Sequence, residues 1–226
     1  MKLFLASQDL GNFATILQEM VGKKKRALVI SNARDYCNDE TRIAGSVEKT
    51  LVNLGKIGIE AERLDLRPFF GKQAELARYI EEKQAGLIFS VGGNVICLAT
   101  ALHESGMDEI IRQGVAEDRF VYGGYSAGSM VASHNLSLYL IDAKSGEELP
   151  PCFNPDATKE IYGVESYRQG LGLIPEYVIP HMDRSDCIDV MRKGLNKIAQ
   201  AGAEAICLDD AGVFVVNDEN KEILKG

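Results

Sequence analysis

Short strand-like runs alternate with segments of helical periodicity through the first half of the chain. The runs are Leu3–Ala6, Ala27–Ser31, Ile59–Leu64, Leu87–Val91 and Phe120–Tyr122. Before the third run, apolar residues recur at three- and four-residue steps and stop at Gly55, which is typical of an amphipathic helix with a glycine end. Strands that alternate with helices form parallel sheets covered on both faces. We therefore predict a three-layer α/β fold with a mostly parallel, flavodoxin-like sheet.

The second half of the chain has a weaker pattern. It predicts a helix over Ser129–Ser133, a short strand over Ser137–Ile141 and an irregular segment from Lys144 to Gly170. Regular structure then returns as a strand, a helix and two strands joined by a hairpin-like turn: Tyr177–Pro180, Asp186–Ala199, Ala205–Leu208 and Val213–Val216.

Length and composition indicate one domain over residues 1–226, because 46% of the residues are hydrophobic and no linker-like segment interrupts them. The net charge of −8 disfavours a nucleic-acid partner, since phosphate binding needs a basic surface. The apolar start of the chain turns polar at Gln8, too early for a signal peptide or a membrane span. We expect a cytoplasmic monomer or homodimer that does not bind membranes.

The sequence carries no motif for a metal or a cofactor. Its five cysteines include no C-x-x-C pair, which argues against a disulfide framework and a structural zinc site. Neither G-x-x-x-x-G-K-[ST] nor a G-x-G-x-x-G after the first strand is present. We therefore predict no cofactor.

The segment Gly124-Tyr125-Ser126-Ala127-Gly128 matches the G-x-S-x-G pattern and follows an apolar run. In a nucleophile elbow, a sharp strand-to-helix turn leaves no room for a β-carbon at the two glycines and lifts the serine hydroxyl to a helix N-terminus. Spare backbone N–H groups there can hold an oxyanion. The alternative is a glycine-rich turn that only caps a helix.

An activated serine needs a base, and the chain offers three histidines. His134 lies eight residues beyond Ser126, about 12 Å along the expected helix. His103 falls near the end of a helix, away from the carboxyl ends of the strands where α/β proteins bind ligands. His181 follows the strand-like Tyr177–Pro180 and is the predicted base, the alternative being a structural histidine in a loop.

Two aspartates could orient the imidazole and stabilise its protonated form. Asp210 follows Ala205–Leu208, again at a strand end, and is the preferred residue. Asp142 follows Ser137–Ile141 and is the alternative.

A second glycine turn, Ser90-Val91-Gly92-Gly93-Asn94, also follows an apolar strand and precedes a helix. Its N–H groups could complete an oxyanion hole, because the donor after the nucleophile usually has a companion from a neighbouring loop. Asn94 could at the same time be the helix N-cap. We also place Asn94 among the substrate-binding residues.

With these residues in view, the chain resembles the serine peptidase family that contains peptidase E and cyanophycinase. The resemblance runs over almost the whole length and rests on four blocks in the family's order: Ser90–Asn94, Gly124–Ser129, Gly172-Leu173 leading to Ile179–Met182, and Leu208–Asp210. It implies a fold like that of class I glutamine amidotransferases, with Ser126 as nucleophile, His181 as base, and Gly93 and Ala127 as oxyanion donors.

The family's acid is a glutamate in the block that matches Leu208–Asp210, or an aspartate soon after the nucleophile. Asp210 and Asp142 occupy the corresponding places here. Peptidase E recognises a substrate N-terminal aspartate through a basic residue beyond the histidine, and Arg184 and Arg192 are the candidates for this role. Either is equally consistent with an ordinary surface arginine.

Three functions fit these residues. The first is a peptidase that cleaves a small peptide through an acyl-enzyme on Ser126. The second is an esterase or other acyl hydrolase with the same three residues. The third is a flavodoxin-like domain without activity, whose glycine turns bind a small ligand.

Overall fold

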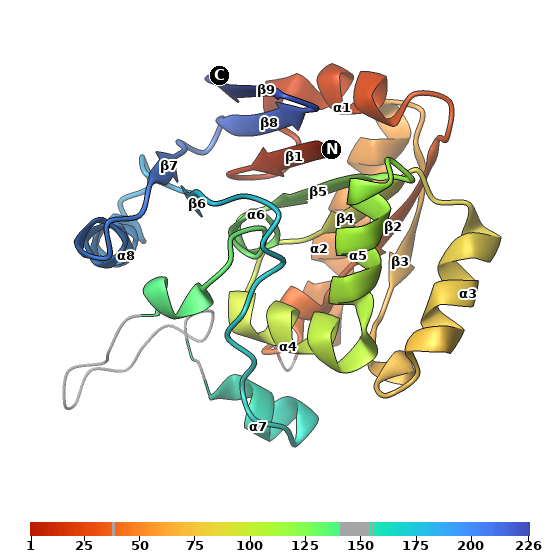
Figure 1. Ribbon diagram of the computed structural model, residues 1–226, viewed down its shortest axis with the longest axis horizontal. Coiled ribbons are helices and arrows are strands. Elements are labelled where there is room, and N and C mark those ends of the chain that lie inside the picture. The colour runs from red at the N-terminus through yellow and green to blue at the C-terminus, as the bar shows by residue number, and fades with distance from the viewer. Residues whose placement is uncertain (38, 141–153, 155) are drawn as a thin grey trace.

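A seven-stranded sheet forms the centre of the computed structural model, which describes residues 1–37, 39–140, 154 and 156–226 (Figure 1). Its strand order is β3-β2-β4-β5-β1-β8-β9. The strands are β1 (Lys2–Ala6), β2 (Arg26–Ile30), β3 (Glu60–Leu64), β4 (Leu87–Ser90), β5 (Val121–Tyr125), β8 (Val213–Asn217) and β9 (Asn220–Leu224). The first five are parallel to one another, while β8 runs antiparallel to both β1 and β9.

Helices cover both faces of this sheet, as the right-handed connections between parallel strands require. In Figure 1, α5 lies in front of the sheet and α2 behind it. The first two helices follow β1 and β2, and the next three follow β3 and β4 on the opposite face. They are α1 (Ala14–Val21), α2 (Glu40–Lys56), α3 (Gln73–Lys83), α4 (Val95–Ser105) and α5 (Met107–Ala116). Short 3-10 turns add η1 (Gly11–Phe13), η2 (Asn32–Arg34) and η3 (Arg67–Phe69).

The sequence prediction of five parallel strands and three layers is confirmed. The largest boundary error concerns β5, which continues to Tyr125 rather than ending at Tyr122. Gly123 and Gly124 lie inside the strand, and a β-carbon at Gly123 would come within 2.8 Å of the Phe89 ring. The glycines allow β5 to pack closely here.

The region after β5 is less regular than the sequence suggested. The predicted helix over Ser129–Ser133 is wrong in its extent, because α6 covers only Ala127–Met130. The predicted strand over Ser137–Ile141 is also wrong for residues 137–140, the part of it that the structure describes. A 3-10 turn, η4 (Leu136–Leu138), stands there, and Asn135 Oδ1 accepts the Ser137 N–H at its start (3.0 Å).

Within the segment predicted to be irregular, residues 156–170 contain one short helix, α7 (Ala157–Tyr162). Its packing partner is α4. The side chain of Asn94 at the start of α4 donates to the Asn154 carbonyl (2.8 Å), so this segment is tied to the loop after β4.

A second, two-stranded sheet lies beside the main one. Its strands β6 (Tyr177–Ile179) and β7 (Ala205–Cys207) are parallel, and α8 (Ile188–Gln200) connects them. The predicted hairpin between the last two strand-like runs is therefore wrong: β7 pairs with β6, and β8 pairs with β1 and β9. The sequence reading missed β9, because its Asn220-Lys221-Glu222 start is polar.

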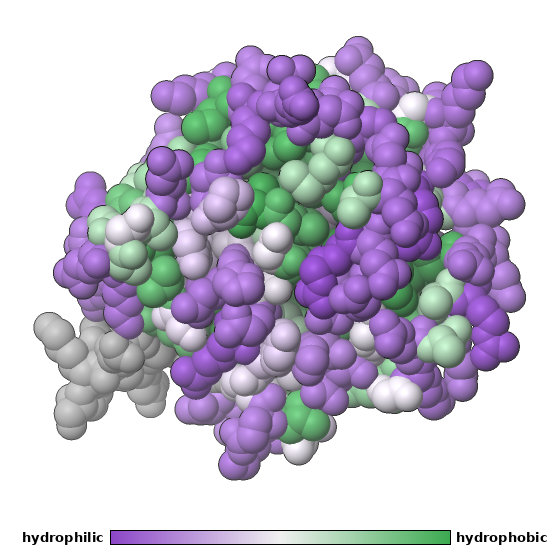
Figure 2. Space-filling view, viewed as in Figure 1, coloured by the Kyte–Doolittle hydropathy of each residue, from purple (hydrophilic) through white to green (hydrophobic). Residues whose placement is uncertain are grey.

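The face shown in Figure 2 is largely hydrophilic, with a small group of apolar side chains near its centre. The apolar residues of the central strands lie inside, and Leu3, Phe4 and Leu5 of β1 are fully buried. In the described ranges, none of the helices is both long and apolar enough to cross a bilayer.

Candidate active site

Ser126 lies at a sharp turn between β5 and α6. Its φ of 52° is in the left-handed region, which side chains other than glycine rarely adopt. Its N–H donates to the Ala6 carbonyl at the end of the neighbouring strand β1 (3.1 Å). The turn therefore holds the Ser126 side chain at the carboxyl edge of the parallel sheet, where α/β proteins bind ligands.

The glycines on either side of Ser126 are required by close packing. A β-carbon at Gly124 would lie 2.7 Å from the Gly128 carbonyl carbon, and one at Gly128 would lie 2.1 Å from the Ser90 carbonyl oxygen. Both distances are shorter than non-bonded atoms allow. Gly128 thus lets α6 rest directly on the end of β4.

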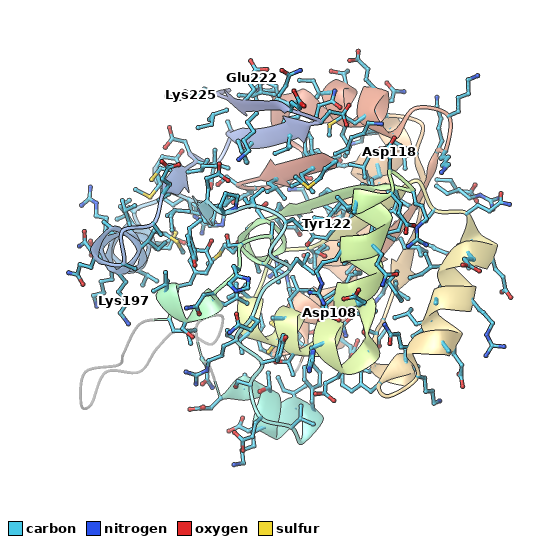
Figure 3. The ribbon with its side chains drawn as sticks, viewed as in Figure 1. Asp108, Asp118, Tyr122, Lys197, Glu222 and Lys225 are labelled. Atoms are coloured by element: carbon cyan, nitrogen blue, oxygen red, sulfur yellow. The ribbon has the colours of Figure 1, made fainter. Side chains whose placement is uncertain are left out.

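Two buried hydroxyl groups hold this turn in place. The Ser129 hydroxyl lies 2.7 Å from the Ala6 oxygen and 2.9 Å from the Gly124 oxygen. Tyr122, near the centre of the sheet in Figure 3, donates its hydroxyl to the Gly128 carbonyl (2.8 Å). Buried polar groups that are all bonded favour a single conformation.

His181 follows β6 and also has a left-handed backbone, with φ 60°. Its N–H donates to the Ser7 hydroxyl, which lies just beyond β1 (2.9 Å). The pairing of β6 with β7 continues past the strands, since Leu208 N–H donates to Ile179 and Met182 N–H donates to Leu208 (2.9 and 3.1 Å). This pairing brings the residues after β7 beside the imidazole.

The structure brings Ser126, His181 and Asp210 into one hydrogen-bonded chain. His181 Nε2 lies 3.0 Å from Ser126 Oγ, and Nδ1 lies 2.5 Å from Asp210 Oδ1. A carboxylate only accepts hydrogen bonds, so Asp210 selects the tautomer with a proton on Nδ1 and leaves Nε2 free to accept the serine proton. The Asp183 carboxylate in turn accepts the Asp210 N–H (2.8 Å).

The other two histidines lie elsewhere. His103 on α4 stacks on Tyr167 with ring centroids 3.7 Å apart, and its Nδ1 is 3.6 Å from Asp108, which Figure 3 labels. His134 is exposed beyond the end of α6, and its carbonyl accepts the Gly170 N–H (2.7 Å). The alternative acid Asp142 lies outside the described residues.

The glycine turn after β4 lines the same pocket as Ser126 and His181. Gly93 has a φ of +152° and packs so closely that a β-carbon there would lie 2.1 Å from the Ala33 carbonyl oxygen. Among the described residues, the N–H groups of Gly93 and Ala127 have no acceptor. Two free donors beside a serine hydroxyl are what an oxyanion hole requires.

Asn94 is the N-cap of α4, as the sequence suggested. Its Oδ1 accepts the N–H groups of Ile96 and Cys97 (2.9 and 3.1 Å), and the residue is only 1% exposed. That Asn94 contacts a substrate directly stays a prediction. The buried position of its side chain does not favour such a contact.

A pocket of about 440 Å³ opens onto Ser126, His181, Gly92 and Gly93. Arg184 also lines it, with Nε bonded to Asp186 (2.9 Å) and Nη1 bonded to Gln8 (3.1 Å). The hydrogen bond to Asp186 holds the pKa of Arg184 above its ordinary value. Arg192 is exposed on α8.

A cysteine lines the same pocket but is poorly suited to be its nucleophile. Burial raises the pKa of the Cys187 thiol to about 11. The thiolate is the reactive form of cysteine, so at neutral pH this side chain stays protonated. In the described part of the chain, no cluster of histidine, cysteine and carboxylate side chains could hold a metal ion.

A buried carboxylate, Asp35, links α7 to η2. Asp35 accepts hydrogen bonds from Tyr162 on α7 (2.6 Å) and from Asn32 on η2 (2.8 Å). Burial raises the pKa of Asp35, and these two hydrogen bonds oppose the rise. The network ties α7 to η2, which packs against α4.

Sequence reasoning missed Ser7, Asp183 and Arg34, another residue that lines the pocket. Ser7 and Arg34 follow β1 and β2, so the rule that ligands bind at the carboxyl ends of parallel strands could have found them. Asp183 carries no such signal, because its role depends on the pairing of β6 with β7.

Comparison with known proteins was made by sequence family and by structure. The model of the family described as "Peptidase family S51" matches residues 3–224. No curated protein matches the sequence significantly. A candidate peptidase E protein from Listeria monocytogenes EGD-e has a similar structure, with a TM-score of 0.73 and 18% identity over 99% of this chain and 98% of its own. A peptidase from an acI-B1 actinobacterium gives a TM-score of 0.66 and 21% identity, covering 100% of this chain and 87% of its own.

Proposed function

Because this chain belongs to peptidase family S51, we propose that it hydrolyses a peptide bond of a small peptide through an acyl-enzyme on Ser126. The observation that carries the proposal is the hydrogen-bonded chain from Ser126 through His181 to Asp210, with distances of 3.0 and 2.5 Å. A serine, a base and an orienting acid in this order activate a hydroxyl group that is otherwise a weak nucleophile.

In the first half of the reaction, Ser126 Oγ attacks the peptide carbonyl carbon while His181 Nε2 takes the hydroxyl proton. Negative charge develops on the carbonyl oxygen, which the N–H groups of Gly93 and Ala127 stabilise. Asp210 stabilises the imidazolium. The C–N bond then breaks, and His181 passes its proton to the leaving amine.

In the second half, water attacks the ester formed with Ser126. His181 accepts a proton from the water and returns it to Ser126 Oγ as the acyl bond breaks. The acid product leaves, and the free hydroxyl is restored. No metal or cofactor takes part in these steps.

The first test is labelling with a fluorophosphonate, which reacts with activated serines. The wild type should label at a single site, and Ser126→Ala should not label while it keeps the melting temperature of the wild type. Labelling of the wild type and of Ser126→Ala to the same extent would remove Ser126 from the mechanism, and absence of labelling in both would favour a domain without activity.

The second test separates a peptidase from an esterase, which would use the same residues. A panel of dipeptides that differ in the N-terminal residue is compared with short acyl esters such as p-nitrophenyl acetate. We expect at least one dipeptide to be cleaved, and its cleavage to be lost in Ser126→Ala. Turnover of the esters alone would replace the peptidase by an acyl hydrolase.

A further inference from the structure

Three cationic side chains line the pocket that opens onto Ser126: Arg34, Lys49 and Arg184. They differ in how their charges are balanced. Arg184 bonds to the Asp186 carboxylate through Nε (2.9 Å), and Lys49 Nζ lies 3.1 Å from the Asp9 carboxylate. Both of these cations already have an anionic partner within the protein.

Arg34 has no such partner in the part of the chain that the structure describes. Among the described residues, its side chain makes no ion pair and no hydrogen bond, and its Nε is shielded from solvent without an acceptor. Guanidinium groups in proteins are always charged and carry five N–H donors. Buried donors in native structures are nearly always bonded, so a shielded donor without a partner calls for an explanation such as a ligand.

The backbone places Arg34 beside the glycine turn after β4, which contains Gly93. Arg34 ends η2, and the carbonyl of the preceding residue, Ala33, accepts the Asn94 N–H (2.7 Å). The same carbonyl is so close to Gly93 that no β-carbon fits between them. Arg34 therefore follows directly after the residue that packs on Gly93, and its side chain lines the same pocket as Gly93 and Ser126.

We propose that Arg34 determines specificity by binding the carboxy-terminal carboxylate of a dipeptide substrate; this rests on the proposed peptidase function. A guanidinium fits a carboxylate through two parallel hydrogen bonds. In a dipeptide the terminal carboxylate lies one residue from the scissile carbonyl, whichever side chains are present. Arg34 would then select dipeptides over longer peptides, whose chain continues at that point.

The test compares four substrates: Ala-Leu, Ala-Leu amide, Asp-Leu and Asp-Leu amide. Amidation removes the terminal carboxylate, and Asp adds a carboxylate on a side chain. We expect Arg34→Gln to lower kcat/KM by about 10- to 100-fold for the two free acids and by less than about twofold for the two amides. Arg34→Lys keeps the charge without the planar fork and should give an intermediate loss for the free acids.

Lys49→Gln is the matched control, because it removes the same charge from the same pocket but at a residue already paired with Asp9. It should change kcat/KM by less than about twofold for all four substrates. Equal losses in Arg34→Gln for acids and amides would overturn the proposal. A loss of kcat/KM for the two Asp substrates but not for the two Ala substrates would mean that Arg34 binds an acidic side chain. This result would overturn the proposal as well.

A binding measurement separates this proposal from the proposed function. In the Ser126→Ala background, calorimetry should show that Arg34→Gln weakens binding of Ala-Leu by about tenfold or more and leaves binding of Ala-Leu amide unchanged. If the wild type cleaves none of the dipeptides but this difference in binding is found, the peptidase proposal fails and the role of Arg34 stands. If binding of Ala-Leu is the same with and without Arg34, its role is excluded.

Discussion

The two halves of the candidate site are assembled in different ways. Ser126 is held by groups close to it in the chain, Tyr122 to Ser129, together with the end of β1. His181 and Asp210 are held by residues far apart in sequence: Ser7 bonds the His181 backbone, and Asp183 bonds the Asp210 backbone. The serine half belongs to the central sheet, whereas the histidine half depends on the separate pairing of β6 with β7.

This difference determines what each half tolerates. The serine half is packed backbone against backbone, so it is sensitive to a single added carbon atom. The histidine half is a set of single hydrogen bonds between separate elements, so it should weaken stepwise as each bond is removed. Substitutions in the two halves can test this contrast.

The largest effect is expected from Asp210→Asn. An amide at this position can donate to Nδ1, which places the ring proton on Nε2 and prevents His181 from accepting the serine proton. We expect kcat to fall by about 1,000- to 10,000-fold with little change in stability. Steady-state kinetics on the best dipeptide would measure this.

The substitution Asp209→Asn is the control. It removes the same charge at the neighbouring residue, whose side chain is exposed. Asp142→Asn should be measured beside it, because the sequence left Asp142 as the alternative acid. A larger loss in Asp142→Asn than in Asp210→Asn would transfer the acid role to Asp142.

The next effect concerns the serine half. Gly128→Ala places a β-carbon 2.1 Å from the Ser90 oxygen, so the turn must move. A displacement on the order of 1 Å at the reacting groups can cost about 100-fold in rate. We expect the rate of fluorophosphonate labelling to fall by about this factor and the melting temperature to decrease.

Gly55→Ala is the matched control for Gly128→Ala. It adds the same carbon in α2 where no atom lies within 4 Å, so it should stabilise the protein by about 0.5–1 kcal/mol and leave labelling unchanged. If Gly128→Ala is labelled at the wild-type rate, the serine half tolerates an added carbon atom, and the contrast drawn between the two halves is wrong.

The smallest effect is expected from Ser7→Ala, which removes the acceptor of the His181 N–H. His181 then loses one of the bonds that hold its left-handed backbone. We expect kcat to fall by about tenfold with KM nearly unchanged, since the pocket is intact. Ser105→Ala removes another fully buried hydroxyl, far from the site on α4, and should lower the melting temperature without changing kcat. Equal effects of the two variants on kcat would make Ser7 a purely structural residue.

The same contrast explains how much the sequence could predict. Strands β1–β5 follow from local strand-like runs, and the position of Ser126 follows from five neighbouring residues. The placement of His181 beside Ser126 was predicted because His181 follows a strand, by elimination among three histidines. These inferences needed only short-range patterns.

The remainder depends on contacts between distant segments. The apolar runs of β7 and β8 are adjacent in sequence, which suggested a hairpin, but β7 pairs with β6 and β8 pairs with β1. The support of Asp210 by Asp183 arises only from the pairing of β6 with β7. That Arg34 forms no ion pair with the residues the structure describes is a property of the folded pocket, which no sequence pattern records.

Ser126 and His181 both have left-handed backbone conformations, with φ of 52° and 60°. A residue other than glycine in a sparsely populated backbone region costs about 1–3 kcal/mol of stability. Glycine at either position would relieve this strain but would remove a side chain on which the proposed reaction depends. Selection for stability alone would therefore favour inactive descendants of this chain, and an active lineage must be maintained by continued demand for its catalysis.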